Sequence, residues 1–179
     1  MAVAAGLIAP SCQAEVANNP AVLQGVVVGV IDGDTADVRL DSGMIRVRFH
    51  AIDAPEFGQP HGKAAKAALS DLIFGKAVEV EPFEQDRYDR LVARVWLDGV
   101  DVNAAMIKSG NAWTYRRYAD EPAYCAHEKA AREQERGLWR LPPADRVAPW
   151  EWRQRKSREG HFTDYSRETV AACVAELGK

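Results

Sequence analysis

The fold of this chain is decided by residues 30–56, whose sequence is VIDGDTADVRLDSGMIRVRFHAIDAPE. Apolar and polar residues alternate over 36–41 and again over 45–51, which is the pattern of two half-buried strands. The residues at 41–43, Asp-Ser-Gly, are turn formers, and the glycine can adopt a positive φ. The segment is therefore predicted to form a β-hairpin.

The hairpin is predicted to bring two carboxylates together. If the strands fold about 41–43, the numbers of opposite residues sum to about 85. Asp34 then lies near Ala51 and Asp53, at the open end of the hairpin. Neighbouring carboxylates raise each other's pKa unless a cation lies between them, and their oxygens suit Ca²⁺ or Mg²⁺. Asp34 and Asp53 are therefore candidate ligands of a divalent cation.

Three further residues complete a set suited to phosphodiester hydrolysis, which requires charge neutralisation and an activated water. Glu56 is the candidate general base. Arg48 and Arg90, the second at the exit of the polar turn 86–90, are candidate donors to phosphate oxygens. Taken singly, these residues have ordinary interpretations as turn formers, solvated acids or surface charges. The set as a whole favours the catalytic interpretation.

The rest of the chain predicts three more strands and several helices. The strands are expected at 25–31, 77–83 and 91–97, and the helices at 60–74, 102–109 and 121–136. Five strands with a helix between the third and fourth match the order of an OB-type barrel. The predicted fold class is α+β, a five-stranded OB-type barrel packed with about three helices and followed by a C-terminal arm and helix. Such barrels bind oligonucleotides across one face, but a fold does not establish a function.

Finer details of the helices are also predicted. Ala64 and Leu69 belong to the apolar face of helix 60–74, and Asp120 is the expected N-cap of helix 121–136. The segment after Trp139 is interpreted as an extended arm with a stabilising role. The tail at 163–177 is expected to be helical.

Composition limits the class of protein. The chain has 179 residues and a formal net charge of −3, which argues against binding nucleic acid by bulk charge. An enzyme that contacts a few phosphates through a few arginines is not excluded. No apolar run approaches the ~20 residues that span a bilayer, and no pair of cysteines has zinc-ligand spacing. We expect a monomer.

The chain is divided into three regions by composition. Residues 1–19 are interpreted as an export signal, with cleavage after Ala14, or as a disordered leader. Residues 20–140 form the predicted nuclease domain, and 141–179 a C-terminal extension packed on it. Cys125 and Cys173 would form a disulfide in an exported protein, whereas in a cytosolic protein they would be buried free thiols.

Several segments together resemble the staphylococcal nuclease (thermonuclease) family. They are VIDGDT at 30–35, RFHAIDAPE at 48–56, RYDR at 87–90, VN at 102–103 and GLW at 137–139. Each is weak alone, but the order and spacing over 25–139 are specific. The resemblance implies an OB-type barrel with Ca²⁺ as cofactor. It also implies hydrolysis of DNA and RNA with low sequence specificity, leaving 3′-phosphate and 5′-hydroxyl ends.

The resemblance also assigns roles by motif position. The residues that match the metal ligands are Asp34, Asp53 and, through its backbone carbonyl, Ala54. Those that match catalytic residues are Glu56 as the general base and Arg48 and Arg90 as the phosphate-binding arginines.

The substrate contacts are assigned in the same way to Arg87, Tyr88 and Tyr115, with Tyr118 as an alternative to Tyr115. Two residues depart from the family pattern. Ala54 stands where the founding member has threonine, which should be tolerated because the backbone carbonyl is the ligand, and Asp89 stands where many members have glycine. An acid at this position would weaken substrate binding or require an altered turn.

Three functions remain open from the sequence. The first is a secreted or periplasmic nuclease that prefers single-stranded DNA and RNA. The second is a non-catalytic OB-fold module that binds nucleic acid, and the third is an exported protein with a vestigial site. The complete set of acids and arginines favours the first.

Overall fold

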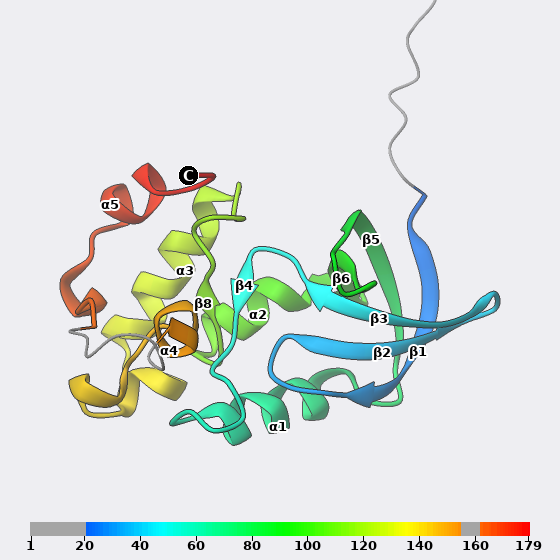
Figure 1. Cartoon of the computed structure of the whole chain (residues 1–179), viewed down its shortest axis with the longest axis horizontal. Coiled ribbons are helices and arrows are strands. Elements are labelled where there is room, and N and C mark those ends of the chain that lie inside the picture. Colours follow the sequence, from blue (N-terminus) through cyan, green and yellow to red (C-terminus); the bar gives the residue numbers. More distant parts are fainter. Residues whose placement is uncertain (1–20, 155–161) are drawn as a thin grey trace, which may run out of the picture.

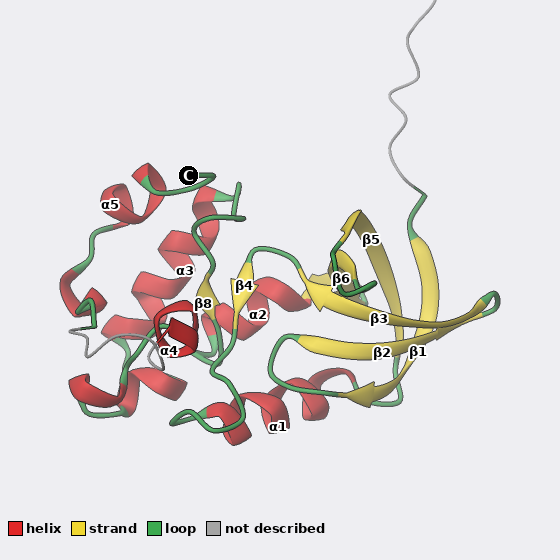
Figure 2. Ribbon diagram, in the orientation of Figure 1, coloured by secondary structure: helices red, strands yellow, loops and turns green. Residues whose placement is uncertain are grey.

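The computed structural model describes residues 21–154 and 162–179. The predicted leader at 1–19 lies outside these ranges. A barrel of long strands occupies one side of the molecule, and α3, α4 and α5 occupy the other, with the short strands β4 and β8 between them (Figures 1 and 2). No helix in the described ranges combines the length and apolarity that a bilayer span requires.

The described residues form eight strands and five α-helices. The strands are β1 (Leu23–Val30), β2 (Thr35–Leu40), β3 (Gly43–Phe49), β4 (Ile52–Asp53), β5 (Ala77–Gln85), β6 (Leu91–Leu97), β7 (Val100–Asp101) and β8 (Trp113–Thr114). The α-helices are α1 (Gly62–Ile73), α2 (Val102–Lys108), α3 (Pro122–Glu133), α4 (Pro149–Gln154) and α5 (Val170–Ala175). Short 3₁₀ turns occur at Gly137–Arg140, Pro143–Asp145 and Tyr165–Arg167.

The five long strands form an OB-type barrel, so the predicted fold class is confirmed. The sheet has the order β3-β2-β1-β5-β6-β7, and a parallel pairing between β3 and β6 closes it. In that pairing Arg48 lies opposite Val92. Because Arg90 immediately precedes β6, closure of the barrel brings the two predicted phosphate-binding arginines to the same edge.

The predicted register of the hairpin is wrong by two residues. Thr35 pairs with Arg48 and Leu40 with Gly43, so opposite numbers sum to 83. The turn is tighter than expected because only two residues lie outside the ladder. Asp34 is therefore opposite Phe49, whose N–H donates to the Asp34 carbonyl at 2.8 Å.

Two details of the helices also differ from prediction. The face of α1 that packs on the barrel contains Ala65 and Leu69, whereas Ala64 is exposed. The N-cap of α3 is Glu121 rather than Asp120, and no side chain caps the helix. Pro122 at the first helical position has no N–H to satisfy, which reduces the need for a side-chain cap.

The C-terminal extension is more helical near its start and less helical near its end than predicted. Pro149–Gln154 is the helix α4, not part of an extended arm, and Val170–Ala175 is the only α-helix within the described part of 163–177. Trp150 of α4 packs edge-to-face on Trp113 at 5.9 Å. This contact attaches α4 to the nuclease domain.

A disulfide and a buried ionic network attach the extension to α3. Cys125 of α3 is bonded to Cys173 of α5, with their Cα atoms 5.8 Å apart. Arg116 donates to Glu128 at 2.8 Å and also pairs with Glu168 of the extension. Because Glu128 is 1% exposed, the guanidinium supplies the cation that its buried carboxylate requires.

We predict that replacing both Cys125 and Cys173 by serine lowers the free energy of unfolding by about 2–4 kcal/mol, because the bridge closes a long loop in the unfolded chain. Urea denaturation followed by far-UV circular dichroism measures this change. Reductant should destabilise the wild-type protein to a similar extent and leave the double variant unaffected. An unchanged urea midpoint would contradict the prediction.

Candidate active site

The position of Asp34 is fixed by both its backbone and its side chain. Its N–H binds the Asp32 carboxylate at 3.0 Å, which shapes the turn before β2. Its Oδ2 accepts a hydrogen bond from the Ala54 N–H at 2.6 Å, and its Oδ1 accepts one from the Thr35 hydroxyl at 3.1 Å. The carboxylate is therefore held against the segment that follows β4.

Asp53 reaches the same place because the chain bends sharply after β3. Ala51 has a φ of 63°, and Asn103 of α2 fixes the bend by donating to the His50 carbonyl at 2.9 Å. Asp53 then lies in β4, paired with Trp113 of β8, and is 1% exposed. The bend compensates for the shorter register of the hairpin, so Asp34 and Asp53 still converge.

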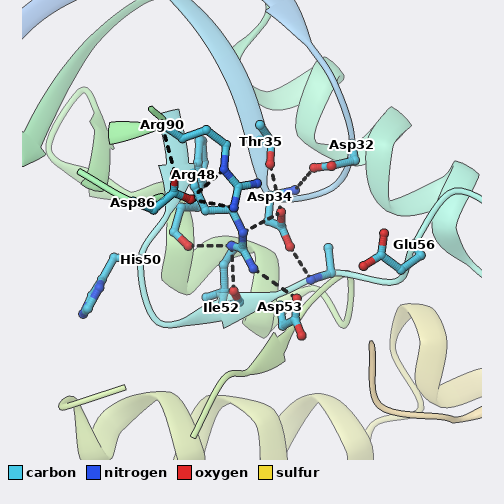
Figure 3. Close-up of polar contacts among 12 residues, drawn as sticks. Asp32, Asp34, Thr35, Arg48, His50, Ile52, Asp53, Glu56, Asp86 and Arg90 are labelled. Atoms are coloured by element: carbon cyan, nitrogen blue, oxygen red, sulfur yellow. Dashed lines mark hydrogen bonds and ion pairs between the residues drawn. The ribbon is translucent and has the colours of Figure 1, made fainter. Parts of the chain in front are cut away.

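Arg48, which the sequence predicts to donate to phosphate oxygens, here links the two aspartates (Figure 3). Its Nη2 donates to Asp53 Oδ1 at 3.0 Å, and its Nε lies 3.3 Å from Asp34 Oδ1. Nη1 donates to the carbonyls of Phe49 and Ile52 at 2.8 and 2.9 Å. These backbone contacts hold the guanidinium in one orientation between the two carboxylates.

Burial makes these carboxylates dependent on positive charge. It raises the pKa of Asp34 to about 7, although Arg48 acts in the opposite direction. Burial also raises the pKa of Asp53, opposed by hydrogen bonds from Arg153 and by the charge of Arg48. A further cation beside them would favour the ionised forms.

Arg153 is a charged residue of the site that the sequence analysis missed. It lies on α4, in the extension to which only a stabilising role was assigned, yet its guanidinium binds two of the predicted site acids. Nη1 and Nη2 donate to the two carboxylate oxygens of Asp53 at 3.0 and 2.8 Å, and Nη1 also donates to Glu56 Oε1 at 2.8 Å. No sequence signal identified it, because 100 residues separate it from Asp53.

Arg90 lies beside Arg48 at the closed edge of the barrel (Figure 3). Its Nε and Nη2 pair with Asp86 Oδ2 at 2.8 and 2.7 Å, and Asp86 Oδ1 accepts its backbone N–H at 3.1 Å. Asp86 therefore orients the arginine through both its side chain and its backbone.

The predicted substrate contacts lie around the mouth of the site. Tyr88 is 63% exposed, and its hydroxyl accepts a hydrogen bond from Arg87 at 2.7 Å. Tyr115 stacks on Trp150 with ring centroids 5.5 Å apart, so one of its faces is covered. Tyr118 is 46% exposed and contacts Tyr115 edge-to-face.

One cavity of about 810 Å³ unites the predicted residues. Its lining includes Asp34, Arg48, Asp53, Ala54, Glu56, Arg87, Tyr88, Arg90 and Tyr115, together with Arg117 and Arg153. Arg153 is the residue of α4 that lines the cavity. Such a cavity can hold a phosphate group between guanidinium groups and carboxylates.

The donor set fits a hard divalent cation. Asp34 and Asp53 supply carboxylate oxygens. Ala54 follows Asp53 directly and donates its N–H to Asp34 Oδ2, so its backbone carbonyl is also close to the two aspartates. In the described ranges, no cluster of three or more acidic, histidine or cysteine side chains could hold a metal ion. A cation here would therefore need a backbone or water oxygen beside the two aspartates.

Comparison with known proteins identifies the family. The model of the family described as staphylococcal nuclease homologue matches residues 46–141. An uncharacterized endonuclease of Escherichia coli is 42% identical over 135 residues, which are 75% of this chain and 87% of the relative. This chain belongs to the staphylococcal nuclease family.

Other relatives extend the comparison. The micrococcal nuclease of Shigella flexneri is 41% identical over 143 residues, covering 73% of this chain and 80% of the relative. The probable staphylococcal-like nuclease CAN1 of rice is 41% identical over 111 residues, covering 62% of this chain and 33% of the relative. The protein is therefore a nuclease, an enzyme that hydrolyses phosphodiester bonds.

The departure of this nuclease at Asp89 has a simple structural basis. Asp89 has a φ of 58°, in the left-handed region where glycine is favoured and aspartate is tolerated. Its side chain is exposed, and the acid that pairs with Arg90 is Asp86. The turn therefore keeps a glycine-like backbone without placing a second carboxylate on Arg90.

We predict that Asp89→Gly changes the free energy of unfolding by less than about 0.5 kcal/mol, because glycine adopts this backbone readily. Asp89→Val should lower it by about 1–2 kcal/mol, because a β-branched residue is strained at positive φ. Urea denaturation of the two variants measures the difference. Equal stability of both variants would show that the turn does not require this conformation.

Proposed function

We propose that this nuclease is a calcium-dependent endonuclease that acts on DNA and RNA with low sequence specificity and leaves 3′-phosphate and 5′-hydroxyl ends. The observation that carries the proposal is the convergence of Asp34, Asp53 and Arg48, with Glu56 and Arg90 in the same cavity. These are the residue types that phosphodiester hydrolysis requires.

The acids and arginines have separate roles in this proposal. Asp34, Asp53 and the Ala54 carbonyl would hold Ca²⁺, which supplies positive charge beside the scissile phosphate. Arg48, fixed by two backbone carbonyls, donates to one side of the phosphate. Arg90, oriented by Asp86, donates to another. Together they oppose the negative charge that develops on the phosphate oxygens.

Glu56 is the proposed general base. Its side chain is 39% exposed within the cavity, so water reaches it. The carboxylate takes a proton from the attacking water as the new P–O bond forms. The P–O5′ bond then breaks, and the leaving O5′ takes a proton from solvent water, which gives the 5′-hydroxyl and 3′-phosphate products.

We predict that purified protein degrades DNA in Ca²⁺ and that EDTA abolishes the activity. Glu56→Gln and Arg48→Ala should each reduce the rate by about 10²–10³-fold, since one removes the base and the other a donor to the transition state. A nuclease gel across Ca²⁺, Mg²⁺ and EDTA measures this.

A matched control is Glu79→Gln, which neutralises an exposed acid of β5 outside the cavity lining and should keep full activity. Full activity of the double variant Glu56→Gln/Arg48→Ala would contradict the proposed mechanism. Binding of nucleic acid without cleavage under any divalent cation would favour the non-catalytic alternative.

We also propose that single strands are the preferred form of substrate. The exposed rings of Tyr88 and Tyr118 lie at the cavity mouth, where unpaired bases could stack on them. A duplex keeps its bases paired and cannot offer them to these rings without melting. Cleavage of a single strand should therefore be faster than cleavage of the same strand in a duplex, measured with end-labelled DNA; equal rates would contradict the preference.

Export to the periplasm or medium is the proposed location. The disulfide between Cys125 and Cys173 supports it, because structural disulfides persist in oxidising compartments. We predict that nuclease activity and the oxidised protein appear in the periplasmic or culture fraction of producing cells. Activity confined to the cytosol, with both thiols free, would contradict this location.

A further inference from the structure

In the described part of the C-terminal extension, the side chain of Arg153 contacts the acids of the site. The Arg153 guanidinium forms a fork on Asp53, with Nη1–Oδ1 at 3.0 Å and Nη2–Oδ2 at 2.8 Å, and Nη1 lies 2.8 Å from Glu56 Oε1. It therefore spans a proposed cation ligand and the proposed general base. The proposed hydrolysis uses both acids, and the same guanidinium binds both.

The position of Arg153 is set by the packing of α4. Trp150, one helical turn earlier, stacks on Tyr115 with an interplanar angle of 3°. Ala148, the residue before α4, is fully buried, and the carbonyl of Val147 accepts a hydrogen bond from Gln59. This packing fixes the position of α4, and α4 in turn places Arg153 beside the acids.

The two guanidinium groups on Asp53 differ in how firmly they are held. Arg48 is 14% exposed and also binds two backbone carbonyls, so its removal from the site would leave those carbonyls unpaired. The Arg153 side chain is 41% exposed and its hydrogen bonds described here are to carboxylates. Arg153 is the one that solvent and another cation can displace at lower cost.

We propose that Arg153 is an intramolecular competitor of the divalent cation: it pairs with Asp53 and Glu56 when cation is scarce, and cation binding displaces it. This inference rests on the proposed cation site at Asp34 and Asp53. Its physical basis is that a guanidinium on Asp53 uses the carboxylate lone pairs and repels a second cation at close range. Displacement also frees Glu56 to act on water, so occupancy by cation and release of the base are coupled.

The test is calcium affinity without nucleic acid, measured by isothermal titration calorimetry at low ionic strength. Arg153→Gln should bind Ca²⁺ about 10-fold more tightly than wild type or better, because a nearby positive charge is removed. Arg153→Lys, which keeps the charge but loses the fork, should fall between them. Arg117→Gln is the matched control. It removes one charge from an exposed residue that lines the same cavity and contacts the Tyr118 ring. This variant should change the affinity for Ca²⁺ less than about 3-fold.

Thermal stability provides a second readout, which separates competition from a merely structural role. In EDTA, Arg153→Gln should unfold at a lower temperature than wild type, because the buried Asp53 loses its forked partner. In saturating Ca²⁺ this deficit should shrink or reverse, because the cation binds the variant more tightly. A structural role alone would leave the same deficit in both conditions.

The outcomes distinguish this inference from the proposed function. If wild type binds Ca²⁺ and Arg153→Gln binds it equally or more weakly, competition by Arg153 is wrong while the cation site stands. If neither protein binds Ca²⁺, the cation site and the competition are both wrong. If Arg153→Gln fails to fold, the Arg153→Lys variant decides, and wild-type affinity in that variant overturns the inference.

Discussion

The structure depends on the contact of one guanidinium with two buried carboxylates. Arg48 lies between Asp34 and Asp53, and both acids are almost excluded from solvent. Burial disfavours the ionised carboxylates, so their positions are stable only with positive charge beside them. The bend after β3 and the closure of the barrel both serve to assemble this group. The positive charge that these acids require also suits the site to phosphate chemistry, because guanidinium groups and a bound cation can hold an anionic phosphate.

The C-terminal extension belongs to the same electrostatic system. A disulfide, an ionic network around Glu128 and aromatic packing of Trp150 attach it to the nuclease domain. These attachments would suffice for a purely stabilising segment. The forked contact of Arg153 with Asp53 makes the extension part of the site as well. The same segment therefore carries both stabilising contacts and a contact with a buried acid of the site, although it lies outside the sequence motifs.

The aromatic side chains around α4 and β8 fall into a packed group of tryptophans and an exposed group of tyrosines. Trp113 packs edge-to-face against both Trp139 and Trp150, and none of the three lines the cavity, whereas Tyr88 and Tyr118 line it and remain exposed. Tyr115 lies between the two groups, with one face on Trp150 and an edge toward Tyr118. A movement of α4 would therefore shift the ring of Tyr115, because Tyr115 stacks on Trp150. Tyr115 thus connects the extension to the surface where bases would stack.

Local sequence patterns are enough to predict the barrel class and the hairpin and to single out the acids and arginines, because alternation and turn chemistry are local properties of the chain. These patterns placed Asp34 opposite the wrong residue, since register depends on how tightly 41–43 turns, and they described 149–152 as extended. The bend at Ala51, which restores the meeting of Asp34 with Asp53, and the approach of Arg153 on α4 to Asp53 are seen in the folded chain alone. Contacts between residues about 100 positions apart are set by the packing of whole elements, so local sequence patterns do not predict them.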